Sequence, residues 1–122
     1  NLEFFLIELN KKDISLICLA GYMKILNKKF INKFNKKIIN IHPSLLPKYK
    51  GLNTFKRVIE NKEKLTGCTV HYANSKLDSG KIILKKKVNI DINDNEKSLK
   101  AKVQAKEHRA YSESIIDIFR QN

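Results

Sequence analysis

The chain has 122 residues and 42% of them are hydrophobic, which is enough for the core of one domain and argues against a disordered chain. No apolar stretch approaches the roughly 18 residues of a membrane-spanning helix, and the amino-terminal segment has neither a basic leader nor a small-residue cleavage site. We therefore expect a single domain over residues 1–122, without a membrane span or signal peptide and located in the cytoplasm.

The positive charge is high, but its pattern is not typical of a nucleic-acid interface. The formal net charge is +13, and clustered basic side chains can bind phosphates by releasing counterions. Only three of the 25 basic residues are arginine, the side chain suited to bidentate reading of bases and phosphates, and the lysines are scattered along the chain. We expect solvated lysine faces and no nucleic acid partner.

The two cysteines indicate reduced thiols and no metal site. Cys18 and Cys68 each lie within an apolar run, and neither belongs to a CxxC pair or to a Cys/His spacing that would suit zinc. Free, buried thiols are the plain interpretation, and they agree with a cytoplasmic protein.

The first third of the chain alternates between helical and strand patterns. Apolar residues at helical spacing predict a helix over residues 2–9, and the continuous apolar run at residues 14–21 suits a strand covered on both sides. Residues 27–34 predict a short helix, and residues 37–41 predict a second buried strand. A helix followed by a buried strand is the half-unit of an α/β fold.

The rest of the chain continues the alternation and ends in a long helix. A helix is predicted at about residues 53–61, strands at residues 67–73 and 82–90, and a helix from about Glu96 to Phe119. The basic run Lys85–Lys87 is typical of a charged edge strand. Each of three elements has residues that are predicted to point inward. They are Phe55, Val58 and Ile59 in the helix at 53–61, Ile82, Leu84, Val88 and Ile90 in the strand at 82–90, and Leu99, Val103 and Ala110 in the final helix.

Two polar residues interrupt the apolar pattern at the end of the strand predicted over residues 37–41. Asn40 and His42 are two positions apart, so they project from the same face of a strand, and they stand at its carboxyl end, where parallel α/β sheets place their ligands. The alternative is that both merely hydrogen-bond the loop backbone. Asp78, in a turn after a later strand, could fix the orientation of the imidazole. An amide donor, a proton carrier and a carboxylate would together make an acyl-transfer centre without an attacking side chain.

Five segments carry a resemblance to a known family. "LAGYMKIL", "NIHPSLLPKYKGLNT", "TGCTVHY", "LDSGKII" and "VQAKEHRAY" resemble successive motifs of the phosphoribosylglycinamide formyltransferases, in order and at the family's spacing, from about residue 2 to residue 120. The family's first strands and its glycine-rich phosphate loop have no counterpart here. The resemblance therefore implies a Rossmann-like formyltransferase sheet with helices on both faces, truncated at its amino-terminal side, with an antiparallel edge region and a long final helix.

The resemblance also implies a reaction. In this family 10-formyltetrahydrofolate donates its formyl group to the amine of glycinamide ribonucleotide, by direct attack through a tetrahedral intermediate and without a metal. Carried over to this chain, Asn40 donates a hydrogen bond to the oxyanion, His42 acts as general acid or proton shuttle, and Asp78 holds His42 and an ordered water.

The binding residues follow from the same resemblance. The pterin and formyl arm are expected against Met23, Lys24, Ile25 and Leu26, and against the turn formed by Asn74, Ser75, Lys76, Leu77 and Asp78, with Asn40 beside them. Gln104 and Glu107 share a helix face and match positions that meet the ribonucleotide. Without the resemblance, the apolar members would be interpreted as core and the helical pair as solvent-facing.

Three residues depart from the family pattern. Lys24 stands where the family commonly has arginine, Asn53 replaces a histidine, and Ser79 lies where glycine is frequent. We assign structural roles to His71 and His108, although both match family positions.

Several alternatives remain open. Methionyl-tRNA formyltransferase and formyltetrahydrofolate deformylase share the Asn, His and Asp plan, but "HPSLLPKYKGLNT" and "VQAKEHRAY" resemble the purine enzyme more closely. An inactive fragment or a basic binding module is the non-enzymatic alternative. Central strands without neighbours would also allow self-association through an exposed sheet edge.

Overall fold

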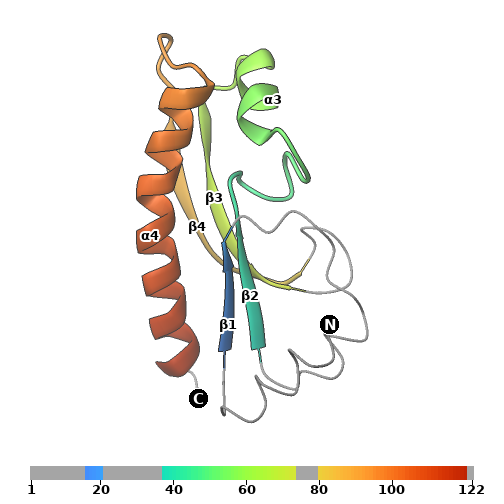
Figure 1. Cartoon of the computed structure of the whole chain (residues 1–122), viewed down its shortest axis with the longest axis vertical. Coiled ribbons are helices and arrows are strands. Elements are labelled where there is room, and N and C mark those ends of the chain that lie inside the picture. The colour runs from blue at the N-terminus through green and yellow to red at the C-terminus, as the bar shows by residue number, and fades with distance from the viewer. Residues whose placement is uncertain (1–15, 21–36, 74–79, 121–122) are drawn as a thin grey trace, which may run out of the picture.

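The computed structural model describes residues 16–20, 37–73 and 80–120, which form a mixed α/β arrangement (Figure 1). The elements are β1 (Leu16–Ala20), β2 (Lys37–His42), α3 (Thr54–Glu60), β3 (Leu65–Tyr72), β4 (Ile82–Asn89) and α4 (Glu96–Arg120). All six coincide within a few residues with elements predicted from the sequence. The helices predicted over residues 2–9 and 27–34 lie outside the described residues.

The strands form one sheet in the order β1-β2-β3-β4. β1 and β2 are parallel, whereas β3 runs antiparallel to both β2 and β4, so the predicted antiparallel edge region is confirmed. β1 and β4 are the edge strands within the described part of the sheet. Self-association through such an edge stays a prediction.

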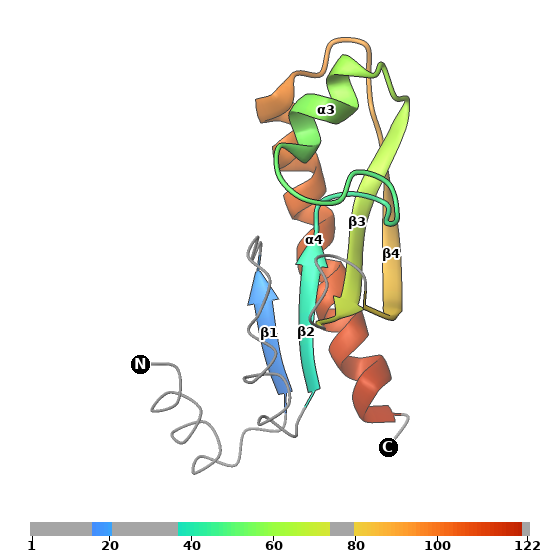
Figure 2. The same cartoon turned by 90° about the vertical axis from the view of Figure 1, so that its right-hand side faces the viewer.

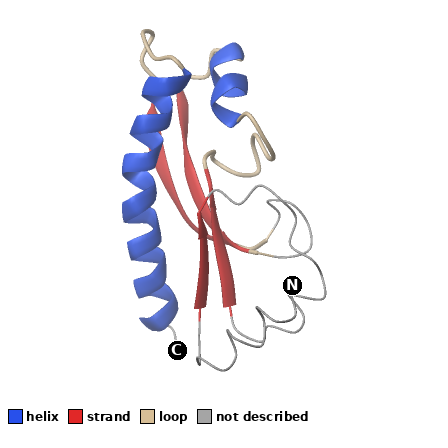
Figure 3. Cartoon of the chain, in the orientation of Figure 1, coloured by secondary structure: helices blue, strands red, loops and turns tan. Residues whose placement is uncertain are grey.

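Helix α4 covers one face of β3 and β4 and supplies much of the core (Figures 1 and 3). Leu99, Val103 and Ala110 are fully buried, as their helical spacing predicts. The sheet contributes Ile39, Ile41, Cys68, Val70 and Val88 to the same cluster. Because side chains alternate along a strand, burial of Ile39 and Ile41 against α4 leaves the neighbouring residues of β2 on the opposite face.

The start of α4 is fixed by a reciprocal cap. The Oδ1 atom of Asn95 accepts a hydrogen bond from the Ser98 backbone N–H at 2.8 Å, and the Asn95 N–H donates to the Ser98 hydroxyl at 2.9 Å. One turn later, Lys102 donates to Asp94 at 2.6 Å, and this bond, together with hydrogen bonds from Ser98 and the Asp91 backbone N–H, lowers the pKa of the Asp94 carboxyl to about 2. Asp94 is therefore ionised at neutral pH and anchors the connection from β4 to α4.

Lys85 and Lys86 of β4 have partners on opposite sides of the sheet. Lys86 reaches α4 and pairs with Glu113 at 2.5 Å, whereas Lys85 points the other way and donates to the Leu46 carbonyl at 2.5 Å. The predicted apolar face is only partly buried, since Val88 is 6% exposed but Ile82 is 39% exposed. The pairing of β3 with β4 is irregular at Val70 and His71, which interrupts the simple alternation near Ile82.

The segment between β2 and α3 folds back over β3, on the face turned away from α4 (Figure 2). Gly67 allows this close approach, because a Cβ there would lie 1.9 Å from the Lys86 carbonyl oxygen and 2.8 Å from Leu45 Cδ2. The segment turns sharply through left-handed backbone at Tyr49, Gly51 and Asn53, with φ of 57°, 84° and 57°. It thereby brings residues 44–49 over the end of β2.

Candidate functional site

Strand β2 ends with two buried polar side chains on one face. Asn40 is 6% exposed and His42 is 1% exposed, and their partners across the ladder are His71 and Thr69 of β3. Directly paired residues of antiparallel strands project to the same side, so these four side chains share the face opposite α4. Asn40 and His42 thus lie on one face of β2, as their spacing in the sequence predicts, while their catalytic roles stay predictions.

The amide of Asn40 is oriented by the backbone of the next residue. Its Oδ1 atom accepts a hydrogen bond from the Ile41 N–H at 2.9 Å. A backbone N–H can only donate, so the oxygen end of the amide is assigned by chemistry and the Nδ2 end presents donors. A donor amide held in a buried position is the group that a developing oxyanion requires.

The imidazole of His42 is oriented by the segment that folds back over the strand end. Its Nε2 atom lies 2.7 Å from the Tyr49 carbonyl oxygen. The carbonyl can only accept, so the proton of this hydrogen bond lies on Nε2. The bond gives the buried ring a polar partner, and it supports in part the alternative that His42 hydrogen-bonds the loop backbone.

Several predicted site residues lie outside the described residues. This applies to Met23, Lys24, Ile25, Leu26, Asn74, Ser75, Lys76, Leu77 and Asp78, and also to the departure at Ser79. The structure therefore leaves the folate positions and the third member of the centre as predictions.

Gln104 and Glu107 lie on α4, which packs on the other face of the sheet from Asn40 and His42. Gln104 is exposed and Glu107 is half-buried, and none of the described contacts joins either residue to the polar pair. Burial raises the pKa of the Glu107 carboxyl, and the nearby His108 and Lys100 oppose this rise.

A cavity of about 530 Å³ lies beyond the end of β2, and neither the polar pair nor Gln104 and Glu107 line it. It is bounded by Pro43, which follows His42, by the start of α3, and by the first turns of α4. Its charged lining consists of Lys56, Glu96, Lys97 and Lys100. Three of these four charged residues are lysines, so the cavity carries a net positive lining.

The comparisons with known proteins decide the family. The sequence matches the formyl transferase family over residues 5–115. The chain belongs to this family. It is 49% identical over 98 residues to the phosphoribosylglycinamide formyltransferase of Haemophilus influenzae, a match that covers 80% of this chain and 46% of that protein. It is 44% identical over 107 residues to the trifunctional purine biosynthetic protein adenosine-3 of Gallus gallus, covering 88% of this chain and 11% of that one.

A solved structure gives the same family assignment. The phosphoribosylglycinamide formyltransferase of Anaplasma phagocytophilum superposes with a TM-score of 0.88 at 41% identity, covering 94% of this chain and 56% of that one. The formyltransferase fold predicted from the sequence motifs is therefore confirmed. This formyl transferase chain spans about half the length of the bacterial relatives that it matches.

The other sequence predictions on this formyl transferase have mixed outcomes. Cys68 is a free, fully buried cysteine, and burial raises the pKa of its thiol to about 11, as expected for an unreactive thiol. Asn53 begins α3 without a side-chain cap bond. His71 is buried, with Nδ1 3.2 Å from the Tyr72 carbonyl oxygen, whereas His108 is exposed.

Residues 16–20, 37–73 and 80–120 contain neither a candidate membrane span nor a cluster of candidate metal ligands. No helix there has the length and apolar character needed to cross a bilayer. The same ranges contain no group of three or more His, Cys, Asp or Glu side chains arranged to hold a metal ion.

Sequence reasoning missed the residues that support His42. Ser44 and Thr69 are fully buried hydroxyls that contact the fold-back segment, and neither was selected from the sequence. The available signal was a threonine within the apolar run "GCTVHY", next to a strand that ends in a polar pair. The partner of that hydroxyl, 25 residues away, could not be deduced from the pattern.

The raised pKa of Glu107 predicts a stability that depends on pH. A carboxyl with a raised pKa holds its proton more tightly in the folded state, so the free energy of unfolding decreases as pH rises above the ordinary value of 4.5. We expect Glu107→Gln to be more stable than the parent protein at pH 7 and nearly equal to it at about pH 3. Urea unfolding at both pH values measures this difference. The exposed Glu60 on α3 provides the control Glu60→Gln, and an equal effect of both substitutions would contradict the prediction.

Proposed function

We propose that this protein transfers a formyl group from 10-formyltetrahydrofolate to the amine of glycinamide ribonucleotide. The observation that carries the proposal is the buried pair Asn40 and His42 at the end of β2. Their chemistry fits acyl transfer, and they occur in a chain that is 49% identical to a phosphoribosylglycinamide formyltransferase.

The proposed reaction needs no nucleophile from the protein. The folate supplies a formyl group activated on nitrogen. A bond forms between the amine nitrogen of the ribonucleotide and the formyl carbon, and the bond from that carbon to the folate nitrogen breaks. The electron pair of the broken bond stays on the folate nitrogen, which gains a proton, while the attacking amine loses one. The protein must therefore stabilise an oxyanion and carry one proton.

Asn40 and His42 are suited to these two tasks. The Nδ2 end of Asn40 donates to the oxyanion, because the other end of the amide is held by Ile41. His42 accepts the proton from the attacking amine and delivers it to the leaving nitrogen. Asp78, on the resemblance alone, fixes the ring and an ordered water. Both described side chains are buried, and low solvent access strengthens such interactions.

The ribonucleotide is proposed to extend from the strand end toward α4. The cavity bounded by Pro43 and the first turns of α4 supports this proposal, because its Lys97 and Lys100 would attract an anionic substrate. Gln104 and Glu107, farther along the same helix, would contact the sugar and the glycinamide amine. The folate would lie against residues 23–26 and 74–78. A cytoplasmic location belongs to this proposal as well.

The test is formyl transfer by the full-length protein with three acceptors. We expect a steady-state product with glycinamide ribonucleotide, and no product with methionyl-tRNA. Water as the acceptor would release formate, which is the deformylase reaction. Release of formate alone, or formylation of methionyl-tRNA alone, would overturn the proposal. Salt-sensitive binding of tRNA without any turnover would instead support the basic binding module.

A further inference from the structure

We propose that the cavity beyond the end of β2 is an anion subsite, in which Lys56, Lys97 and Lys100 bind the phosphate of the acceptor as it approaches. The subsite would raise the affinity for the ribonucleotide without taking part in the transfer itself. The identity of the ligand rests on the proposed function, whereas the binding of a phosphate compound can be measured without any formyl transfer.

The three lysines come from two helices that pack at one end of the molecule. Lys56 lies on α3, whereas Lys97 and Lys100 lie on the first two turns of α4. Figures 1 and 2 show α3 beside the start of α4, and Val58 of α3 belongs to the same core cluster as Leu99 of α4. The packing of these helices therefore places three lysines around one cavity of about 530 Å³.

The charges of these lysines have no partner in the described part of the protein. Within residues 16–20, 37–73 and 80–120, none of the three forms an ion pair with a carboxylate. Lys97 and Lys100 are three residues apart and share a helix face, where like charges repel each other. Three lysines and Glu96 give the lining a net charge of +2. A phosphate monoester, with a charge of about −1.5 to −2 at pH 7, complements this lining.

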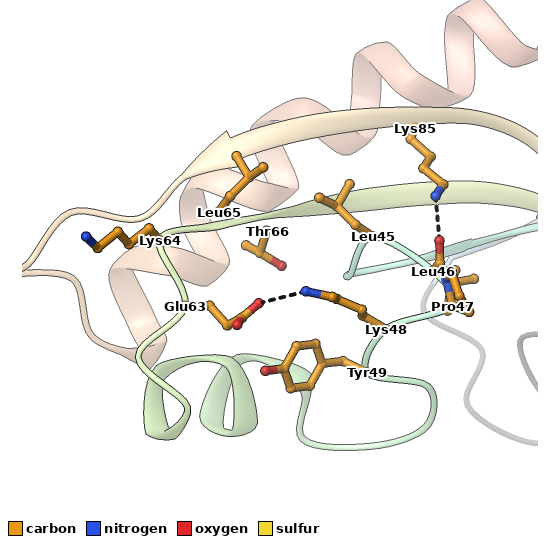
Figure 4. Close-up of a pocket in the computed structure, with 10 residues that line it drawn as sticks. All are labelled: Leu45, Leu46, Pro47, Lys48, Tyr49, Glu63, Lys64, Leu65, Thr66 and Lys85. Atoms are coloured by element: carbon orange, nitrogen blue, oxygen red, sulfur yellow. Dashed lines mark hydrogen bonds and ion pairs between the residues drawn. The ribbon is translucent and has the colours of Figure 1, made fainter.

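A second cavity, of about 420 Å³, shows how lysines are used elsewhere in the molecule. It lies between the fold-back segment and the start of β3 (Figure 4). Lys48 lies 3.6 Å from the Glu63 carboxylate there, and Lys85 donates to the Leu46 carbonyl at 2.5 Å. Two of the three lysines of that cavity therefore have partners within the protein, whereas those beyond β2 are left for a ligand.

Asn53 adds a polar group to the cavity beyond β2. It directly precedes α3 with φ of 57°, and its side chain forms no cap hydrogen bond with that helix. The side chain is exposed, so its amide is available to donate to a phosphate oxygen. Pro43 lines the same cavity and directly follows His42, so an anion bound here lies next to the strand end.

The exposure of the lysines determines what the subsite can do. Because all three are exposed, salt screens their attraction and each contributes modestly. Contacts with a phosphate that takes no part in the reaction are equally strong before and during the transfer. Such uniform binding changes KM and leaves kcat unaltered.

The binding test uses pyrophosphate as the probe, with the full-length protein and no folate. A nitrogen-15 NMR titration at low ionic strength should shift the backbone amide signals of Lys56, Lys97 and Lys100. We expect the dissociation constant to rise about fivefold in the double variant Lys97→Gln/Lys100→Gln. Glu96→Gln should lower the dissociation constant instead, because loss of the acid makes the cavity more positive. A purely structural role of these exposed residues would not produce opposite signs.

The kinetic test measures KM for each substrate separately. In Lys97→Gln/Lys100→Gln at an ionic strength of about 0.01 M, KM for the ribonucleotide should rise about fivefold. The same variant should keep kcat and KM for the formyl donor within about twofold, and its defect should shrink at about 0.15 M. Lys62→Gln/Lys64→Gln is the matched control, because it removes the same charge from exposed lysines that do not line this cavity.

Three outcomes would overturn the inference. The first is pyrophosphate binding that is unchanged in Lys97→Gln/Lys100→Gln. The second is an equal loss of binding in Lys62→Gln/Lys64→Gln, which would show a general effect of net charge. The third is a rise of KM for the formyl donor alone, which would assign the cavity to the folate carboxylates. Pyrophosphate binding in the expected pattern without formylation of the ribonucleotide would overturn the proposed function and leave the anion site established.

Discussion

Replacement of Asn40 by alanine is expected to lower kcat for formyl transfer about a hundredfold or more. The loss of one oxyanion donor typically raises the barrier by about 2.7 to 4 kcal/mol. The Asn40 amide is buried and its oxygen is engaged by the Ile41 N–H, so the donor end is directed in advance of the reaction. Steady-state kinetics with both substrates measures the effect, which should appear in kcat with little change in KM.

Two further variants make this result specific to the amide. Asn40→Asp keeps the oxygen that accepts from Ile41 but removes the donors and adds a negative charge, so it should be at least as inactive as the alanine variant. Asn93→Ala, in an exposed turn before α4, should retain full activity. A value of kcat near that of the parent in Asn40→Ala would remove Asn40 from the oxyanion role.

The sequence predicted the elements of this fold because each has a local signature. The apolar spacing of Leu99, Val103 and Ala110 identifies the buried stripe of α4, and the apolar residues around Asn40 identify β2. The same alternation places Asn40 and His42 on one face, which is a local property of a strand. The core and the polar pair could therefore be predicted before the pairing of the strands was known.

The support of His42 could not be predicted, because it depends on contacts between distant parts of the chain. Thr69 bonds backbone atoms of Ser44 and Leu46, and a backbone group has no sequence signature. Gly67 is needed because Leu45 and β4 approach it, which a strand pattern does not indicate. Ile82 was misjudged for a similar reason, since the irregular pairing near Val70 changes which side chains of β4 are covered.

Replacement of Leu99 by alanine is expected to have the largest effect on stability. Leu99 is fully buried in the core that joins α4 to the sheet, and neighbouring core residues such as Val58 and Val103 are also almost fully buried. Truncation of a buried leucine removes apolar contacts and leaves a cavity, which together lower the free energy of unfolding by about 2–5 kcal/mol. Since a domain is stable by only about 5–15 kcal/mol, the change is a large part of the total.

Urea unfolding followed by circular dichroism measures this change, and Leu52→Ala supplies the matched control. Leu52 is 61% exposed, in the segment before α3, so the same truncation should change the free energy of unfolding by less than about 0.5 kcal/mol. The contrast depends on burial alone, because both substitutions remove the same atoms. Equal losses in the two variants would mean that α4 does not pack on the sheet through Leu99. The cavity at the end of β2, which the first turns of α4 help to enclose, would then lose its structural basis.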